Sequence, residues 1–199
     1  MSHSSNQDQL ILAAIVSSSD DAIIGKDLDG TITSWNMAAE RIFGYTASET
    51  VGQSTRPIVP ADLQHEEDDV LRRLRAGEGI EHYETVRRAK SGKAVQISLT
   101  VSPIKLPDGT IVGASEVARD ITQAKRLERD ARHFAAIVAS SDDAIISKTL
   151  DGTVVTWNAS AERLFGYTAA EIIGRSIRLI VPKDRQSEED DVLSAVSRG

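Results

Sequence analysis

The N-terminal part of the chain alternates short β-branched runs with short helical segments. Residues 22–26 and 31–36 flank Asp29-Gly30, a dipeptide typical of a two-residue β-hairpin turn. Asn36 then stands where its side chain can cap a short helix over 37–43. The pattern therefore predicts a β-hairpin followed by at least one short helix.

A longer helix and three more strands are expected after the hairpin. The helix is predicted over 63–76, capped by Asp62, with acidic residues in its first turns and arginines in its last, as the helix dipole favours. Strands are predicted over 81–87, 95–102 and 110–118, and residues 95–102 alternate apolar and polar side chains. This order of elements predicts an α+β unit with an antiparallel sheet and helices on one face.

The chain also repeats itself at a spacing of about 122 residues. Trp35-Asn36 returns as Trp157-Asn158, and the stretch 43–46 returns as 165–168. Such a long period indicates a duplicated domain, because solenoid repeats are about 20–50 residues long. The second copy stops at Gly199, so we expect it to be incomplete.

Four segments follow from this organisation. We expect an N-terminal helix over 1–19, a complete domain over 20–122, a helical linker over 123–141 and a truncated second domain over 142–199. The truncated domain would hold an isolated hairpin, which is marginal in water, so we expect it to be labile or to be stabilised only by pairing with another chain.

The linker carries apolar residues spaced three and four positions apart, the spacing of a short heptad seam. This seam consists of Ala124, Leu127, Ala131, Phe134 and Val138. Because such seams are typical of helices that associate, we expect the linker to pair in a parallel homodimer.

Composition excludes several classes of protein. The 199 residues include 23 Lys and Arg against 30 Asp and Glu, a net charge of -7, which disfavours nucleic-acid binding. No apolar run approaches the roughly 18 residues of a membrane span. The absence of Cys excludes disulfides, thiolate metal sites and thiol nucleophiles. A cytoplasmic location is expected.

No catalytic or metal-binding constellation stands out. His133 on the linker lacks the neighbouring acid and the following motif of a phosphoacceptor, and there is no glycine-rich phosphate loop. The acidic run 66–69 cannot converge on one cation, because neighbouring helix positions point in different directions. We expect that run to be a solvated first turn, and the chain to have no catalytic residues.

Several short stretches recur in the same order in the two copies. The first copy has Asp21-Ala22-Ile23-Ile24, Trp35-Asn36 and residues 39–45, and the second has 143–146, Trp157-Asn158 and 161–167. The first copy alone also has Arg119-Asp120-Ile121-Thr122. Together they resemble the PAS family, of the S-box type found in bacterial sensors. The resemblance implies a five-stranded antiparallel sheet in the order 2-1-5-4-3 with helices on one face.

The resemblance also implies a role. PAS domains are sensory and interaction modules that hold a small ligand or none, dimerise, and pass signals through flanking helices to an output domain. A bacterial histidine kinase is the expected output here, and a diguanylate cyclase or phosphodiesterase is the alternative. The ligand itself is not identified by the sequence.

Two sets of residues are candidates for this role. Alternation places one set on a single sheet face, where they line a ligand pocket or fill the core: Tyr83, Val95, Ile97, Leu99 and Val101. The other set is Asp120 and Thr122, where the last strand becomes the linker helix. In the family this Asp-x-Thr corner couples strand to helix, so both residues are expected to relay the signal.

A sensor with haem or flavin is the alternative within the family, and no cofactor is assigned. Flavin photosensors of this type use a Cys where Thr55 stands, and the second copy has Ile177 there, so no cysteinyl-flavin adduct can form. Haem sensors use a His on the longer helix. His65 lies near that helix, but the aligned position falls on Glu67.

Overall fold

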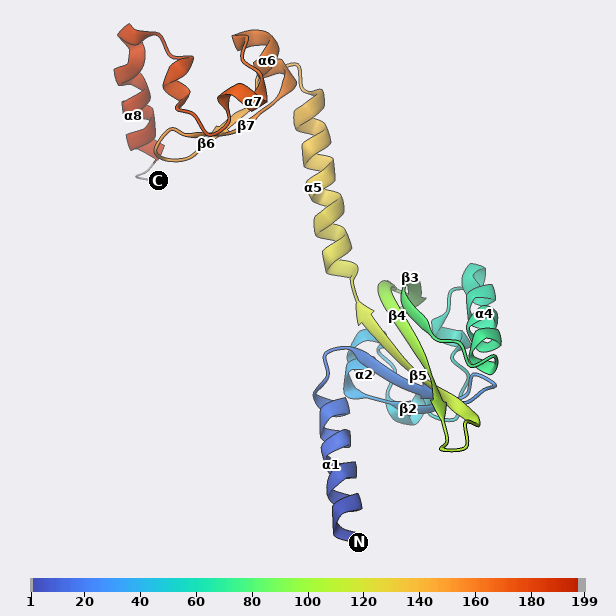
Figure 1. Cartoon of the computed structure of the whole chain (residues 1–199). Coiled ribbons are helices and arrows are strands. Elements are labelled where there is room, and N and C mark those ends of the chain that lie inside the picture. Colours follow the sequence, from blue (N-terminus) through green and yellow to red (C-terminus); the bar gives the residue numbers. More distant parts are fainter. Residues whose placement is uncertain (1, 197–199) are drawn as a thin grey trace. The chain divides into compact units, whose positions relative to one another are not determined.

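The computed structural model describes residues 2–196 and divides the chain into two compact units (Figure 1). Unit 1 is Met1–Arg126 and unit 2 is Leu127–Gly199. The boundary falls inside helix α5 (Thr122–Ser140), so one continuous helix leads from the first unit into the second.

Unit 1 is built on a five-stranded antiparallel sheet. Its elements are α1 (Ser2–Ser18), β1 (Ala22–Lys26), β2 (Ile32–Trp35), α2 (Met37–Phe43), α3 (Ala47–Thr50), η1 (Arg56–Ile58), η2 (Ala61–Leu63), α4 (Gln64–Arg75), β3 (Ile80–Arg88), β4 (Ala94–Lys105) and β5 (Ile111–Asp120). The strand order is β2-β1-β5-β4-β3, which confirms the predicted order 2-1-5-4-3.

The core of unit 1 lies between the sheet and helices α2 and α4. The alternating residues of β4 point into it, and all four are between 1% and 3% exposed: Val95, Ile97, Leu99 and Val101. They pack in one cluster with Phe43 of α2 and Leu74 of α4. These four side chains are therefore part of a filled core.

The short helix after the hairpin begins and ends as the sequence predicts. The Oδ1 atom of Asn36 accepts a hydrogen bond of 2.9 Å from the backbone N–H of Ala39, which caps α2. Gly44 ends the helix with φ of 77°, a left-handed conformation that costs glycine little.

Helix α4 differs from its prediction in two respects. It begins at Gln64, after a 3-10 turn over Ala61–Leu63 that follows Pro60, so Asp62 does not cap it. The acidic run at its start is also not simply solvated. Glu67 faces the sheet and is 3% exposed, and Glu66 is paired with a buried arginine.

Unit 2 repeats the first half of unit 1. After α5 come β6 (Ile146–Lys148), β7 (Val154–Trp157), α6 (Ala159–Phe165), α7 (Ala169–Ile172), η3 (Ile177–Leu179), η4 (Lys183–Arg185) and α8 (Gln186–Val196). The Trp157 and Phe165 rings lie 5.4 Å apart, close to the 5.6 Å between Trp35 and Phe43. Phe43 is fully buried whereas Phe165 is 37% exposed, because in unit 1 Phe43 packs in a core that β4 and β5 help to build.

Candidate functional site

A cavity of about 240 Å³ lies between α4 and the edge strand β3. Polar and apolar side chains share its lining: His65, Glu66, Asp69, Val70, Arg73, Ile80 and Tyr83. Of the five residues predicted to line a pocket, Tyr83 is at this cavity. The four residues of β4 lie in the core, whereas Tyr83, which is directly opposite Leu99 on the neighbouring strand, is 40% exposed.

Glu66 organises the wall of this cavity. Its carboxylate accepts hydrogen bonds from the Tyr83 hydroxyl at 3.1 Å and from the Thr85 hydroxyl at 2.6 Å, and it pairs with the Arg87 guanidinium at 3.1 Å. Burial alone would raise the pKa of Glu66, but these donors outweigh it and the pKa is lowered. Burial and the Glu66 carboxylate together raise the pKa of Tyr83.

The cavity therefore presents an ionised carboxylate, which is paired with Arg87, beside a neutral phenol. Arg73 is also at its lining, where the Nε atom lies 2.8 Å from Oδ2 of Asp69. Such walls suit a small polar molecule, because charged and hydrogen-bonding groups at fixed positions orient a ligand while apolar side chains hold its body.

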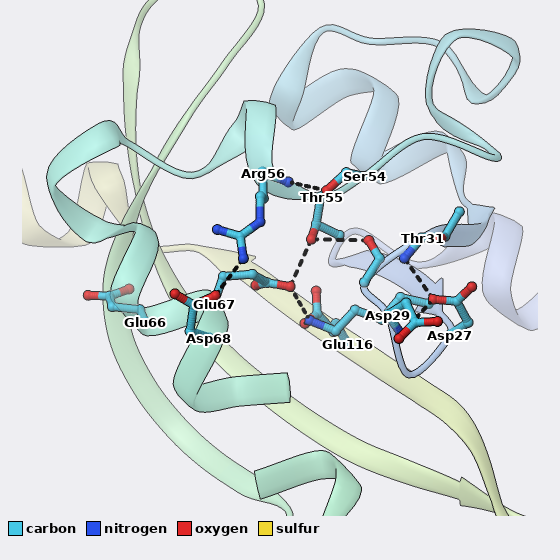
Figure 2. Close-up of polar contacts among 12 residues, drawn as sticks. Asp27, Asp29, Thr31, Ser54, Thr55, Arg56, Glu66, Glu67, Asp68 and Glu116 are labelled. Carbon is cyan, nitrogen blue, oxygen red and sulfur yellow. Dashed lines mark hydrogen bonds and ion pairs between the residues drawn. The ribbon is translucent and has the colours of Figure 1, made fainter. Parts of the chain in front are cut away.

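A second polar group lies deeper in unit 1, between the sheet and α4 (Figure 2). The Nζ atom of Lys26 on β1 lies 2.8 Å from Oε1 of Glu67 on α4 and also contacts Glu116 on β5. The Thr55 hydroxyl donates to the same Glu67 oxygen at 2.8 Å. We call Lys26, Thr55, Glu67 and Glu116 the buried ionic cluster, since each is at most 5% exposed.

The electrostatics of this cluster depend on the two carboxylates. Burial lowers the pKa of Lys26, but the charges of Glu116 and Glu67 outweigh that effect, and the pKa is raised above its ordinary value. Lys26 is therefore held as an ammonium ion, and it links β1, β5 and α4 through charge-assisted contacts.

Sequence reasoning missed the roles of Lys26 and Glu116, although a signal for both is present. Lys26 follows Ile24 in the inward alternation of β1, and Glu116 lies between Ala114 and Ala118 on the inward positions of β5. A charged residue at an inward strand position requires a buried partner.

The positions that the resemblance links to cofactors have polar partners within the protein. Thr55 and Glu67, which align with the flavin cysteine and the haem ligand, are hydrogen-bonded to each other. His65 is exposed, and its Nδ1 atom lies 3.1 Å from the backbone oxygen of Asp62. Among the residues that the structure describes, no group of three or more His, Asp or Glu side chains gathers as a metal site would require.

The predicted relay residues form a compact corner at the end of β5. The Asp120 carboxylate accepts a hydrogen bond of 2.8 Å from the backbone N–H of Thr122, the first residue of α5. The Thr122 hydroxyl accepts one of 3.0 Å from the N–H of Gln96 on β4, and the N–H of Ile121 donates to the Gln96 carbonyl at 2.9 Å. The first turn of α5 is thus hydrogen-bonded to β4, an interior strand of the sheet.

The seam of the linker lies on α5 and is exposed in the single chain. Leu127 and Phe134 are 63% and 68% exposed, Ala124 and Ala131 are exposed, and Val138 is partly buried. Ile137, which the predicted spacing left out, is exposed as well.

Among the described residues no helix is both long and apolar enough to cross a membrane.

Comparison with known proteins agrees with this geometry. The profile of the PAS fold family matches residues 11–121 and 132–198. A crystal structure of the PAS domain of a protein from Colwellia psychrerythraea superposes with a TM-score of 0.53 at 28% identity, and it covers 58% of this chain and 98% of that one.

Two curated proteins are similar over longer stretches. Sensor protein FixL of Bradyrhizobium diazoefficiens is 25% identical over 175 residues, which cover 84% of this chain and 34% of FixL. The cell-division control histidine kinase PdhS of Brucella anthropi is 31% identical over 124 residues, which cover 60% of this chain and 11% of PdhS. The chain thus spans only a minor part of either protein. On the strength of the family profile and the sheet order, this chain belongs to the PAS fold family.

Proposed function

We propose that the chain is the sensory and dimerisation module of a larger signalling protein in the cytoplasm, with a histidine kinase as its output and no catalysis of its own. The main support for this proposal is the hydrogen-bonded corner at Asp120 and Thr122. Helix α5 begins at this corner and carries an exposed apolar seam. The similarity to FixL and PdhS supports a signalling context, since one is named a sensor and the other a histidine kinase.

The input that we propose is a small polar molecule bound in the cavity between α4 and β3. The Glu66 carboxylate, held by Tyr83, Thr85 and Arg87, would accept hydrogen bonds from donor groups of that molecule. The alternative is a sensor whose input is detected by bound haem or flavin. Purified protein with a visible absorption band would favour the cofactor, and a spectrum without one would favour the small polar ligand.

The output that we propose passes through paired α5 helices. Exposed Leu127 and Phe134 lie seven residues apart, so they fall on the same helix face and can pack against the same residues of a second copy. Burying two such side chains removes apolar area from water, which is the main favourable term in helix association.

Light scattering tests this pairing. The wild-type chain is expected to have the mass of a dimer, and Leu127→Asp is expected to be monomeric because it places a charge in the seam. Arg129→Asp, two positions along the helix and off the seam, is the matched control and should stay dimeric. A monomeric wild type, or a Leu127→Asp variant that stays dimeric, would show that the seam is not the interface.

A further inference from the structure

The connector that precedes β1 is bound by an ion pair to β5, the strand that precedes α5. The Arg119 guanidinium on β5 holds the Asp21 carboxylate in a two-pronged pair, with Nη2 at 2.9 Å and Nε at 3.1 Å from its oxygens. Asp21 lies between the end of α1 and the start of β1, and Arg119 stands three residues before α5 begins. One ion pair therefore spans 98 positions of the chain, from the entry of the domain to its exit.

The entry side of this pair is held by a second residue. The amide nitrogen of Asn36 donates to the backbone oxygen of Val16, in the last turn of α1, at 3.0 Å and to that of Asp21 at 3.1 Å. The Asn36 oxygen accepts from the N–H of Ile23 at 3.0 Å. The end of α1, the connector and the start of β1 thus form one hydrogen-bonded unit.

The exit side is equally well defined. Asp120, directly after Arg119, accepts from the N–H of Thr122, and Thr122 is bound to β4 through Gln96. Polar contacts thus link Val16 of α1 through Asn36 and Asp21 to Arg119, and the next residue in the chain, Asp120, bonds the first residue of α5.

We propose that the Asp21–Arg119 pair is a positioning device that couples α1 to α5, so that a change in the helix entering unit 1 alters the helix leaving it. The inference rests on the proposed relay function and names the two side chains through which entry and exit are joined. The pair is suited to this role because its arginine is accessible: the Arg119 side chain is 69% exposed, whereas the Asp21 side chain is 21% exposed. A pair that is open to solvent on one side contributes little to global stability, so it can open without unfolding the domain.

Coupling between two sites is reciprocal. If the pair couples α1 to α5, a substitution of either partner must therefore affect both helices. Amide hydrogen exchange is measured in the last turn of α1 (15–18) and in residues 125–128 of α5, where helical hydrogen bonds begin with the bond from the N–H of Lys125 to the Ile121 carbonyl, in the full chain. Asp21→Asn and Arg119→Gln are each expected to speed exchange about two- to fivefold in both segments, whichever side carries the change. The reversed pair, Asp21→Arg with Arg119→Asp, is expected to restore protection in both.

Two controls separate coupling from general loosening. Asp29→Asn breaks another exposed pair, in which Arg75 lies 3.3 Å away, and it should leave both segments unchanged. The amides of Val95–Val101 in β4 should also stay as protected as in the wild type. Faster exchange confined to the mutated side, equal loosening of β4, the same effect from Asp29→Asn, or no restoration by the reversed pair would each overturn the proposal. The dimer mass measured by light scattering is independent of all these outcomes.

Discussion

Asn36 and Asn158, at equivalent positions in the two units, make matching hydrogen bonds. Each side-chain oxygen accepts two backbone hydrogen bonds. In unit 1 they come from Ile23 of β1 and Ala39 of α2, and in unit 2 from Ile145, directly before β6, and Ala161 of α6. Each amide nitrogen donates to the end of the preceding helix and to the connector after it. A single residue type therefore fixes how a helix enters each unit.

Replacing Asn36 with Ala should cost about 1–3 kcal/mol of unfolding free energy, because it leaves one buried and three partly buried backbone groups without their side-chain partner. Urea unfolding followed by circular dichroism measures this loss. Asn158→Ala is the matched control, and its effect should fall on unit 2 alone. An unchanged unfolding midpoint for Asn36→Ala would mean that water replaces these bonds at no cost.

Lys26→Met should be among the most damaging single substitutions in unit 1. It removes the ammonium ion that Glu67 and Glu116 share and leaves two buried carboxylates uncompensated, at a cost of about 3–5 kcal/mol. Glu116→Gln should cost less, since the Lys26–Glu67 pair survives. Exposed Lys93→Met is the control and should stay within about 0.5 kcal/mol of the wild type. Equal losses for Lys26→Met and Lys93→Met would contradict this account of the cluster.

Acid should weaken unit 1 partly through Glu66. Its pKa is lowered in the folded state, so its contribution to stability is present above the unfolded value of about 4.3 and is lost as pH falls through the folded pKa. Glu66→Gln should therefore be less stable than the wild type at pH 7, and the gap should narrow at about pH 3. A gap that stays constant or widens on acidification, in urea unfolding at both pH values, would show that Glu66 is not the titrating group.

The hairpin of unit 2 should be less protected from hydrogen exchange than strand β4 of unit 1. Among the described strands, β6 and β7 form a two-stranded sheet, whereas β4 is flanked by both β3 and β5. A two-stranded hairpin is marginal in water, so amides of Ile146–Lys148 and Val154–Trp157 should exchange at least about tenfold faster than those of Val95–Val101. Similar protection in a monomer would mean that the helices of unit 2 stabilise its hairpin sufficiently.

Much of the fold could be predicted from the sequence because its signals are local. The Asp29-Gly30 turn, the Asn36 cap and the alternation of 95–102 each act over a few residues, and the repeat presents many of them twice. These signals, with the PAS resemblance, were enough for the strand order that the structure confirms.

The polar interior could not be predicted in the same way, because its partners are distant in sequence. Glu67 is 41 positions from Lys26, so the acidic run of α4 has the local pattern of a solvated turn although Glu67 is buried. The sequence predicts a helix capped by Asp62, but a 3-10 turn follows Pro60 and α4 begins at Gln64. The alternation of β4 identified an inward face, but only packing determines whether that face meets a cavity or a core.

Disulfide cross-linking is the most direct test of a parallel dimer through the seam of α5. The natural chain contains no cysteine, so a single cysteine is the only thiol available for cross-linking. In a parallel pair, equivalent seam positions face each other, so Phe134→Cys should form a disulfide-linked dimer under mild oxidation and Arg129→Cys, off the seam, should not. Equal cross-linking of both variants, or none with Phe134→Cys, would contradict the parallel seam.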